Sequence, residues 1–399
     1  MDVVKVIKGF NAGRDPERLQ LKYQRMRTDP FVFLRGACHL FYDRLPTGGV
    51  FKTAPLVWSC GDLHLENFGS YKGDNRLTYF DLNDFDEGAL APASWDLVRM
   101  LTSLRVGAPS LGFRPGDAQT LCDAFLSAYA TALAQGKAHW VEAQTAHGLI
   151  KDLMESLRDR QRPDFLNTRT VIKGKKRSLK IDGKRALPVS ADQRARVQAF
   201  MADFASQQAH PSFYRVLDVA RRIAGTGSLG VDRYAILVQG KGSPDANYLL
   251  DLKQVLPSAL APHLKVKPPK WDSPAHRVVA IQQRMQAVPM AFLQPVSLGK
   301  TPYVLRGLQP TEDRVSLDAT KRSLADVQRV VATMGRIVAW AQLRSGGRQG
   351  SAITDELIDF AHGKKWKAKL MEASHAFAAQ TLHDAATFAS AYDDGEFKL

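Results

Sequence analysis

Cysteines, acidic residues and long apolar runs are all scarce in this sequence of 399 residues. Its three cysteines, Cys38, Cys60 and Cys122, are scattered and odd in number, so they predict neither a disulfide framework nor a zinc site. No apolar run reaches the length of a membrane-spanning helix, and the opening MDVVKVIKGFNAGRD lacks the apolar core and cleavage site of a signal peptide. We therefore expect a protein of the reducing cytoplasm with no membrane partner.

The shortage of acidic residues leaves a strong positive charge. The chain has 40 Asp and Glu against 55 Lys and Arg, a formal net charge of +15. This excess favours an anionic partner, and nucleotide phosphates, nucleic acid or an acidic protein would each satisfy it. The apolar fraction of 45% is that of an ordinary globular protein, and the length allows two cores. We expect two lobes.

Polar residues are concentrated in GDLHLENFG at 61–69 and in LTYFDLNDFDEG at 77–88. Asp62 and Asn67 follow the apolar run LVW, so a strand is predicted to end there and to place both side chains in one loop. Asp84 follows a second apolar strand. Two strand ends that meet would bring together two carboxylates and an amide oxygen, the hard oxygen ligands that suit magnesium carrying a nucleotide phosphate.

Other interpretations of this stretch remain open. Asp and Asn in a loop are most often turn and cap residues, and a lone D-x-x-x-x-N pattern is common. Metallophosphoesterases also use Gly-Asp-x-His. Their chemistry needs further histidines to hold two metals, and this sequence contains neither Gly-Asn-His nor His-x-His.

A second glycine-rich motif lies in the later part of the chain. The periodicity of residues 215–254 predicts strand, glycine turn, strand, turn and strand. GTGSLG at 225–230 has the form G-x-G-x-x-G, but no helix follows it as a dinucleotide fold would require. A glycine loop between antiparallel strands is typical of kinases, where backbone N–H groups approach the phosphates. Lys253 then stands where a third-strand lysine pairs with the α and β phosphates.

Residues 169–185 carry eight basic residues and only Asp182 against them. Asp182-Gly183 is a hairpin signal, so we expect a basic ribbon or connector. Nucleic acid binding is one interpretation, but no aromatic residues are interleaved to stack on bases, which favours a solvated connector. Ser190, with Gln193 three residues later, predicts a capped helix after it.

The loop D-L-H-L-E-N is similar to the catalytic loop of protein kinases, in which an Asp accepts the proton of the attacking hydroxyl and an Asn binds metal. Cys60-Gly61 stands where protein kinases have His-Arg, and Asp84-Phe85-Asp86 stands where they have Asp-Phe-Gly. The Gly-Asp-Leu-His form, and Asp96 on the following helix, resemble aminoglycoside and choline kinases more closely.

The order of these motifs differs from that in kinases, where the glycine loop and its lysine precede the catalytic loop. A circular permutation explains the difference, because chain termini usually lie at the surface and often near each other. The helix predicted at 323–344, capped by Ser323 with Asp326, would then be the helix that ordinarily leads into the catalytic loop.

Kinases also place a glutamate on the helix after the lysine, to pair with it. That helix is predicted at 273–288, and the strand TPYVLRGL after it would serve as the hinge. Because the only acidic residue from Gln254 to Pro310 is Asp272, the usual partner of Lys253 is missing or altered. A glutamine of the helix could replace it, or an acid from the other lobe; the glutamines are Gln282, Gln283 and Gln286.

The chain as a whole resembles the bacterial domain-of-unknown-function 2252 family, which looks distantly kinase-like. The matching pieces are RMRTDPFVFLRG, CGDLHLENFG, DLNDFDEGALAPASWDLVRM, DVARRIAGTGSLG, LDLK, RVVAIQQRMQ and YVLRGL. Two departures from the family's pattern are Gln254-Val255, where an acidic residue and alanine are usual, and Ala280, where a glutamate is usual.

The resemblance implies a two-lobed, circularly permuted, kinase-like α+β fold that binds ATP and Mg²⁺ between its lobes. Four segments are expected: the first part of a large helical lobe at 1–162, a basic connector and helix at 163–209, a small β-rich nucleotide-binding lobe at 210–310, and the helical remainder of the large lobe at 311–399.

The implied function is phosphotransfer from ATP to a hydroxyl of an unknown small molecule or protein. Asp62 would orient or deprotonate the acceptor, and Lys253 would fix the phosphates. His64 and Asp86 are second choices, for a phosphate contact and a second metal. The predicted site comprises catalytic Asp62, Asn67 and His64, nucleotide-binding Gly225, Gly227, Ser228, Gly230 and Lys253, and metal-binding Asn67, Asp84 and Asp86.

Three alternatives to phosphotransfer remain open. The same residues could transfer AMP from a reversed nucleotide, or the missing glutamate could mark a nucleotide-binding pseudokinase that acts as a scaffold. The basic stretch could bind nucleic acid. Arg35 and Arg99 are expected to form structural ion pairs.

Overall fold

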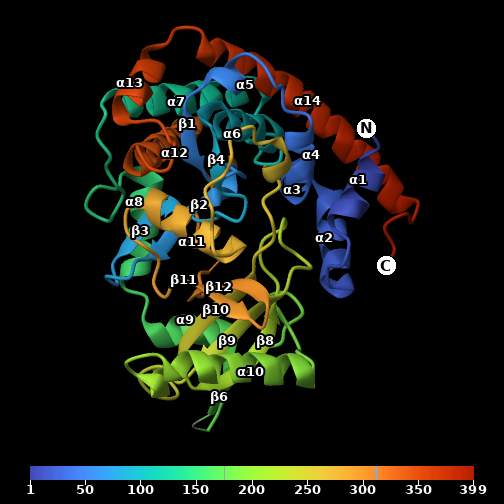
Figure 1. The fold of residues 1–399 in the computed structure, drawn as a ribbon, viewed down its shortest axis with the longest axis vertical. Coiled ribbons are helices and arrows are strands. Elements are labelled where there is room, and N and C mark those ends of the chain that lie inside the picture. The colour runs from blue at the N-terminus through green and yellow to red at the C-terminus, as the bar shows by residue number, and fades with distance from the viewer. Residues whose placement is uncertain (175, 311–312) are drawn as a thin grey trace.

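The computed structural model describes residues 1–174, 176–310 and 313–399. Helices and antiparallel strands are mixed along the chain, so the predicted α+β class is confirmed. None of the helices in these ranges combines the length and apolar character needed to cross a membrane. A helical part and a sheet part lie one above the other in Figure 1.

The helical part is formed by both ends of the chain. Its N-terminal helices are α1 (Val3–Phe10), α2 (Pro16–Thr28), α3 (Pro30–Gly36), α4 (Cys38–Asp43), α5 (Val50–Thr53), α6 (Ala93–Gly107), α7 (Pro115–Ala134) and α8 (Gly148–Arg158). Its C-terminal helices are α12 (Leu324–Ser345), α13 (Thr354–His362) and α14 (Trp366–Asp393). At its centre α12 packs closely along α7. Gly335 allows this approach because it has no side chain, and a side chain there would overlap the carbonyl of Phe125.

Helix α6 is buried on every side, between α7, α14 and the strands before it. The side chains of Asp96 and Arg99 on this helix are almost completely buried. Buried charges of this kind need partners, and both partners lie in the loop after β1.

Two short antiparallel ladders carry the acidic motifs. Strand β1 (Leu56–Ser59) pairs with β4 (Ala89–Pro92), and β2 (Phe68–Lys72) pairs with β3 (Thr78–Leu82). The 3₁₀ turn η1 (Leu65–Asn67) leads into β2. The loops between the two ladders contain Asp62 and Asp84, so the predicted meeting of two strand ends occurs here.

The sheet part is built on one antiparallel sheet in the order β11-β12-β10-β9-β8-β7. Its strands are β7 (Ala186–Leu187), β8 (Val216–Arg222), β9 (Arg233–Val238), β10 (Tyr248–Gln254), β11 (Gln294–Leu298) and β12 (Thr301–Gly307). The pattern of strand, glycine turn, strand, turn and strand predicted for 215–254 is confirmed. Helix α11 (Pro274–Met285) connects β10 to β11, as predicted for 273–288.

The two faces of this sheet differ. Helix α10 (Ala191–Ser206) covers one face, where Met201 packs with Tyr234 and Leu252. Figure 1 shows α10 on the side away from the helical part. Side chains alternate along a strand, so Asp251 and Lys253 point from the opposite face toward the helical part. The segment predicted as a connector thus contributes β7 and α10 to the sheet part.

The basic stretch forms a hairpin, but not at the predicted turn. Helix α9 (Arg162–Arg169) leads into β5 (Thr170–Lys173), which pairs with β6 (Lys176–Leu179). The chain therefore reverses before Asp182 and Gly183. Asp182 instead accepts hydrogen bonds from the N–H groups of Lys184 and Arg185, which shapes the turn before β7. The remaining 3₁₀ turns are η2 (Pro211–Tyr214) and η3 (Ala261–His263).

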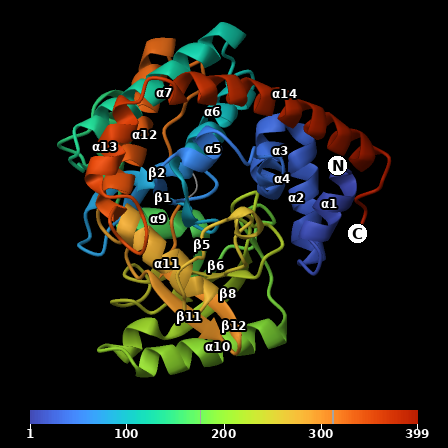
Figure 2. The ribbon, with the colours of Figure 1, turned by 45° about the horizontal axis from the view of Figure 1, so that its top comes forward.

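The two chain ends lie on the same side of the molecule. Figure 2 shows α14 running along the outside of the helical part toward α1 and α2. Lys8 in α1 forms an ion pair with Glu396 at 3.3 Å, and Arg27 in α2 pairs with Asp393 at 2.9 Å. Residues 1–28 and the C-terminus are therefore packed on each other.

Candidate functional site

The loop that carries Asp62 is fixed by a buried carboxylate. Asp96, in the first turn of α6, accepts hydrogen bonds from the N–H groups of Cys60 and Gly61 at 3.0 and 3.1 Å. Gly61 has φ +81, and a side chain there would overlap the carbonyl of Glu87. Burial raises the pKa of Asp96 to about 6. The loop thus leaves β1 in one defined direction and places Asp62 in the space between the two parts.

Asp62 is oriented by an arginine. Its Oδ1 accepts hydrogen bonds from Arg99 Nε and Nη2 at 3.0 and 2.7 Å, and Arg99 also donates to the carbonyl of Leu34. The other carboxylate oxygen lies 3.9 Å from His64 Nε2. Burial, together with the charges of Arg35 and Arg99, lowers the pKa of His64 well below its ordinary value. His64 is therefore neutral at pH 7. Of Arg99 and His64, only Arg99 brings a positive charge to Asp62.

Arg35 and Arg99 both form ion pairs, as the sequence predicted. Arg35 binds Glu66 Oε2 at 2.5 Å, and Arg314 binds the same oxygen. These contacts join α3 and the segment before α12 to the turn after His64.

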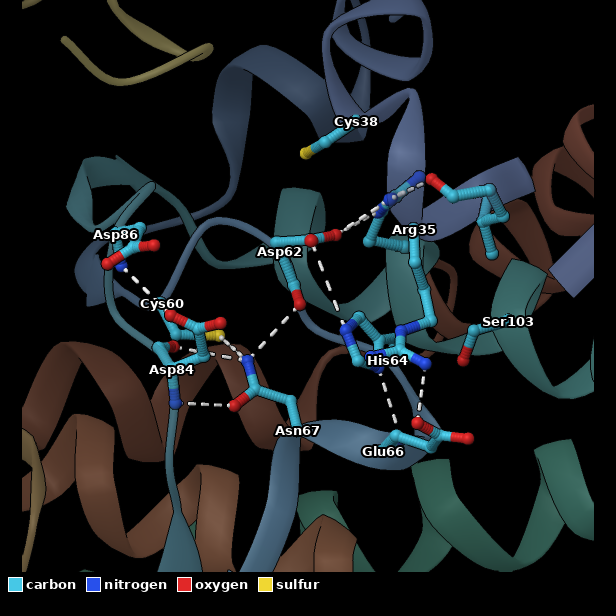
Figure 3. A network of polar contacts seen from close by, with 12 residues as sticks. Arg35, Cys38, Cys60, Asp62, His64, Glu66, Asn67, Asp84, Asp86 and Ser103 are labelled. Carbon is cyan, nitrogen blue, oxygen red and sulfur yellow. Dashed lines mark hydrogen bonds and ion pairs between the residues drawn. The ribbon is translucent and has the colours of Figure 1, made fainter. Parts of the chain in front are cut away.

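Asn67 ties together the two acidic loops. Its Nδ2 donates to the carbonyls of Asp62 and Asp84, each at 3.2 Å, and its Oδ1 accepts from the N–H groups of Asn83 and Asp84 at 3.2 and 2.8 Å. Figure 3 shows Asn67 between the two segments. The oxygen expected to bind metal is thus occupied by backbone donors in this structure.

Lys253 reaches across from the sheet part to the acidic loops. Its Nζ forms an ion pair with Asp86 Oδ2 and lies 3.9 Å from Asp84 Oδ1. Burial raises the pKa of Asp84, but the positive charges of Lys253, Arg306 and Arg233 outweigh it, so the pKa is lowered overall. Asp84 is therefore ionised at neutral pH, and about half of its side chain (51%) is exposed.

The partner of Lys253 comes from the helical part and not from α11. Gln282 donates to Gln286, and Gln286 donates to the carbonyl of Leu82, so neither glutamine is directed to the lysine. Of the two possibilities left open by the sequence, the acid from the other part is confirmed.

A cationic cluster supports the strand that carries Lys253. Asp251 is fully buried and binds Arg222 at 2.8 Å, Arg233 at 2.6 Å and Arg306 at 3.3 Å. Burial raises the pKa of Asp251, but these three guanidinium groups lower it well below its ordinary value. Three positive charges face one carboxylate, so this wall of the site is positive beneath Lys253.

The glycine loop between β8 and β9 is held by the N-terminal segment. Gly227 O accepts hydrogen bonds from Arg14 Nη1 at 2.8 Å and from Lys22 Nζ at 2.9 Å, and Gly230 O accepts from the N–H of Asp15 at 2.8 Å. Lys22 is completely buried, and burial with the nearby charge of Arg14 lowers its pKa well below the ordinary value. We call Arg14, Asp15 and Lys22 the loop clamp.

One cavity of about 70 Å³ lies between these elements. Its walls include the predicted residues Asp62, His64, Asp84, Asp86, Gly225, Gly227, Ser228 and Lys253, together with Arg14, Arg35 and Glu87. Asn67 and Gly230 are not among the residues that line it. Pockets for drug-sized ligands measure about 300–1,000 Å³, so this cavity has the size of a phosphate group and not of a nucleotide.

A family model described as "Uncharacterized protein conserved in bacteria (DUF2252)" matches residues 14–391. The chain belongs to this family. No curated protein and no solved structure matches it. The match begins at Arg14 of the loop clamp and includes every residue of the cavity, so the DUF2252 region contains the complete candidate site.

The acidic residues of this DUF2252 protein can supply part of a magnesium site. Within residues 1–174, 176–310 and 313–399, no group of three or more His, Cys, Asp or Glu is placed to hold a metal. Asp84 and Asp86 nevertheless both line the cavity. Mg²⁺ in nucleotide sites is commonly held by one or two carboxylates, with phosphates and water completing its shell. The donors present fit that arrangement.

Sequence reasoning missed the loop clamp and Glu87. Glu87 Oε2 accepts a hydrogen bond from the N–H of Ala259, and burial raises its pKa to about 7. Arg14 contacts a carbonyl 213 positions later in the chain. No local spacing signals a contact of that kind.

Proposed function

We propose that this DUF2252 protein is an ATP- and magnesium-dependent phosphotransferase with a two-lobed, circularly permuted, kinase-like fold. The observation that carries the proposal is the shared cavity, in which Asp62, Asp84 and Asp86 face Lys253 and the glycine loop. Lys253 and Asp86 are separated by 167 positions in sequence. Four kinase-type motifs predicted from sequence thus converge on one small space.

The order of elements in the sheet part supports the kinase-like fold. The glycine loop joins β8 to β9, Lys253 stands on the next strand β10, and helix α11 follows before β11 and β12. Kinases use a glycine-rich loop, a lysine on the third strand and a helix after it in the same way.

The surroundings of β1 support the permutation. Kinases lead from a long helix into the catalytic loop, and here the end of α12 lies beside β1. The N–H of Ala352 donates to the carbonyl of Leu56 at 2.7 Å, and Trp58 Nε1 donates to the carbonyl of Arg348 at 3.2 Å. The segment after α12 therefore lies beside β1, the strand that leads to Asp62. In the sequence the two are far apart, because β1 belongs to the N-terminal part of the chain and α12 to the C-terminal part.

Asp84 and Asp86 would hold magnesium, which when bound neutralises the charge of the transferred phosphate. Lys253 would exchange Asp86 for the phosphates of ATP, and the positive charges around Asp251 favour an anion at that wall. Because the cavity is small, the glycine loop would have to move away from the acidic loops to admit the nucleotide.

Asp62 would act on the acceptor. A hydroxyl placed against its Oδ2 would pass its proton to that oxygen as the oxygen–phosphorus bond forms, and the bond between the β and γ phosphates would break with release of ADP. Arg99 holds Oδ1, so it acts as a positioning residue that keeps the second oxygen directed into the cavity.

Transfer of label from ATP to acceptors tests this proposal. The protein would be incubated with Mg²⁺, a bacterial metabolite extract and ATP labelled at either the γ or the α phosphate. We expect transfer of the γ label, and a loss of at least about 100-fold in Asp62→Asn, the effect typical of removing a general base. Asp272→Asn, at a side chain 91% exposed, is the matched control and should keep full activity. Transfer of the α label instead would assign nucleotidyl transfer and contradict phosphotransfer.

A second candidate is a nucleotide-binding pseudokinase, favoured by the occupied oxygen of Asn67 and by the absence of an acid on α11. In that case Mg-ATP would raise the melting temperature while neither label is transferred.

A further inference from the structure

A second cavity near the junction of the two parts is distinct from the candidate site. A cavity of about 420 Å³ lies between the β2–β3 hairpin, the connection from α8 to α9, the start of β10, the segment before β11 and the end of β12. Its lining shares no residue with the small cavity. Its volume falls in the range of pockets that bind small organic ligands.

One wall of this larger cavity is aromatic. Phe213, Tyr248 and Phe292 form a cluster with ring centroids 4.7, 5.8 and 5.9 Å apart, and all three are only half-buried. Half-buried aromatic rings keep part of their surface free to contact a further planar group.

The other walls are positive. Among its described lining residues the cavity has five basic side chains, Lys72, Arg76, Arg160, Arg162 and Lys241, and one carboxylate, Asp313. Asp313 is bound by both terminal nitrogens of Arg160, at 2.8 and 2.7 Å. Burial and the charges of Arg162, Arg76 and Arg160 lower the pKa of Lys72, so these cations repel one another. An anion bound among them would relieve that repulsion.

Two of the arginines lie over rings of the aromatic wall. The guanidinium of Arg162 lies 3.6 Å from the ring centroid of Tyr248, and that of Arg76 lies 4.8 Å from the centroid of Phe292. A guanidinium over an aromatic ring keeps its N–H groups at the ring edge free to donate hydrogen bonds. Two such parallel donors match the spacing of two phosphate oxygens.

Two residues of this wall are also strained. Arg76 has φ 70° and Phe292 has φ 64°, a backbone conformation that costs a side-chain-bearing residue about 1–3 kcal/mol. In the described chain the only other residue apart from glycine with positive φ is Gln349. Strain of this kind concentrates at ligand clamps, where the fold holds a side chain in place for binding. Here it holds an arginine and the ring beneath it.

We propose that this cavity is a second ligand site, which binds a small phosphorylated compound with an aromatic ring, of the size of a nucleoside monophosphate. The aromatic ring of the ligand packs against the exposed part of the cluster of Phe213, Tyr248 and Phe292. The phosphate lies between Arg76, Arg162 and Lys72. This site is separate from the cleft that holds Asp84 and Lys253, and it needs no metal.

Binding of AMP, GMP, CMP and UMP in the presence of EDTA tests this site, measured by isothermal titration calorimetry on the full chain. We expect at least one of the four to bind, and its nucleoside and inorganic phosphate each to bind at least tenfold more weakly. Arg76→Ala, Arg162→Ala and Phe292→Leu should each weaken binding at least tenfold. Arg284→Ala is the matched control, because Arg284 stacks on Trp58 and Trp271 away from the cavity, and it should bind like the wild type.

Asp84→Ala separates this site from the cleft and should leave monophosphate binding unchanged. Failure of all four monophosphates to bind overturns the proposal, as does a nucleoside that binds as tightly as its monophosphate. Loss of binding in Asp84→Ala with retention in Arg162→Ala would place the ligand in the cleft instead. Melting curves of each variant distinguish lost binding from lost folding, and Phe292→Leu preserves an apolar side chain if the arginine variants unfold.

Discussion

Two carboxyl groups hold the acidic loops, the buried Asp96 and the half-buried Glu87, and desolvation alters the pKa of each. Asp96 and Glu87 both accept backbone hydrogen bonds, and their pKa values are raised to about 6 and about 7. Desolvation is the largest cause in both cases, because it disfavours the charged carboxylate. Each group therefore contributes most to stability when it is protonated.

Glu87→Gln should change how stability depends on pH. The wild-type carboxyl has its ordinary pKa of 4.5 when unfolded and about 7 when folded. Its contribution is fully present below pH 4.5 and is lost as the pH rises through 7. The unfolding free energy of the wild type minus that of Glu87→Gln should therefore fall by roughly 3 kcal/mol between pH 4.5 and 8. Urea unfolding of both proteins measures this, and a difference that is flat or rises with pH contradicts the assignment.

Asp96→Ala should destabilise the protein by about 2–4 kcal/mol, because it leaves the N–H groups of Cys60 and Gly61 buried without an acceptor. Urea unfolding at pH 5, where Asp96 is protonated, provides the measurement. Asp355→Ala, on an exposed residue of α13, is the control and should leave the midpoint near the wild type. Equal midpoints for the two variants would show that Asp96 does not support the loop.

Single residues were predicted better than their partners. The sequence singled out Asp62, Asp84 and Lys253 from their positions after apolar strands. It could not supply Arg99 for Asp62 or Asp86 for Lys253, because these pairs join segments that meet only in the folded chain. The amide of Asn67 illustrates the same limit, since a position in a motif does not show which groups its oxygen binds.

The glycine loop depends on another element for its position. Arg14 and Lys22 both donate to the carbonyl of Gly227, so the N-terminal segment helps to set how far the loop stands from the acidic loops. A nucleotide that enters the cleft must break or stretch these contacts.

Arg14→Ala should loosen the glycine loop. We expect the backbone amides of residues 225–231 to exchange faster by about tenfold or more, since a lost buried hydrogen bond to a charged group corresponds to ~1.5 kcal/mol or more of local stability. Hydrogen exchange followed by mass spectrometry measures the effect. Arg27→Ala removes a surface ion pair with Asp393 and should leave these amides unchanged. Equal protection in Arg14→Ala and the wild type would show that the clamp does not hold the loop.

Elements with a strong periodic pattern and a cap were predictable. The Ser323 side chain accepts a hydrogen bond from the N–H of Asp326 at the start of α12. The Ser190 side chain accepts one from the N–H of Gln193 at the start of α10, as the spacing of these residues predicted. The turn of the basic hairpin was not predictable. Asp182-Gly183 is a strong turn signal, but it forms the turn before β7 and not the turn between β5 and β6. Strand β6 pairs with β5 from Lys176 onward, before that turn signal.

At the scale of the molecule, the adjacent termini and the contact of the α12 end with β1 support a permuted chain. Joining the termini with a short Gly-Ser linker and opening the chain between Arg158 and Asp159, both exposed, would restore the kinase order of motifs. We expect this variant to unfold cooperatively with a melting temperature within about 3 °C of the wild type, a shift of ~2 kcal/mol or less.

The control for the permutant opens the chain between Leu97 and Val98, which are fully buried in α6. Circular dichroism should show that this control does not fold. If the permutant opened at Arg158 also fails to fold, the native order of the chain is required, and the permutation account loses its support.

The most direct test of the cleft is the binding of Mg-ATP to Asp84→Ala, measured by isothermal titration calorimetry with and without Mg²⁺. The account predicts magnesium-dependent binding to the wild type and to Asp272→Ala, and binding at least about 100-fold weaker in Asp84→Ala, a loss of ~2.7 kcal/mol. Equally tight, magnesium-dependent binding of ATP to Asp84→Ala and the wild type would contradict it.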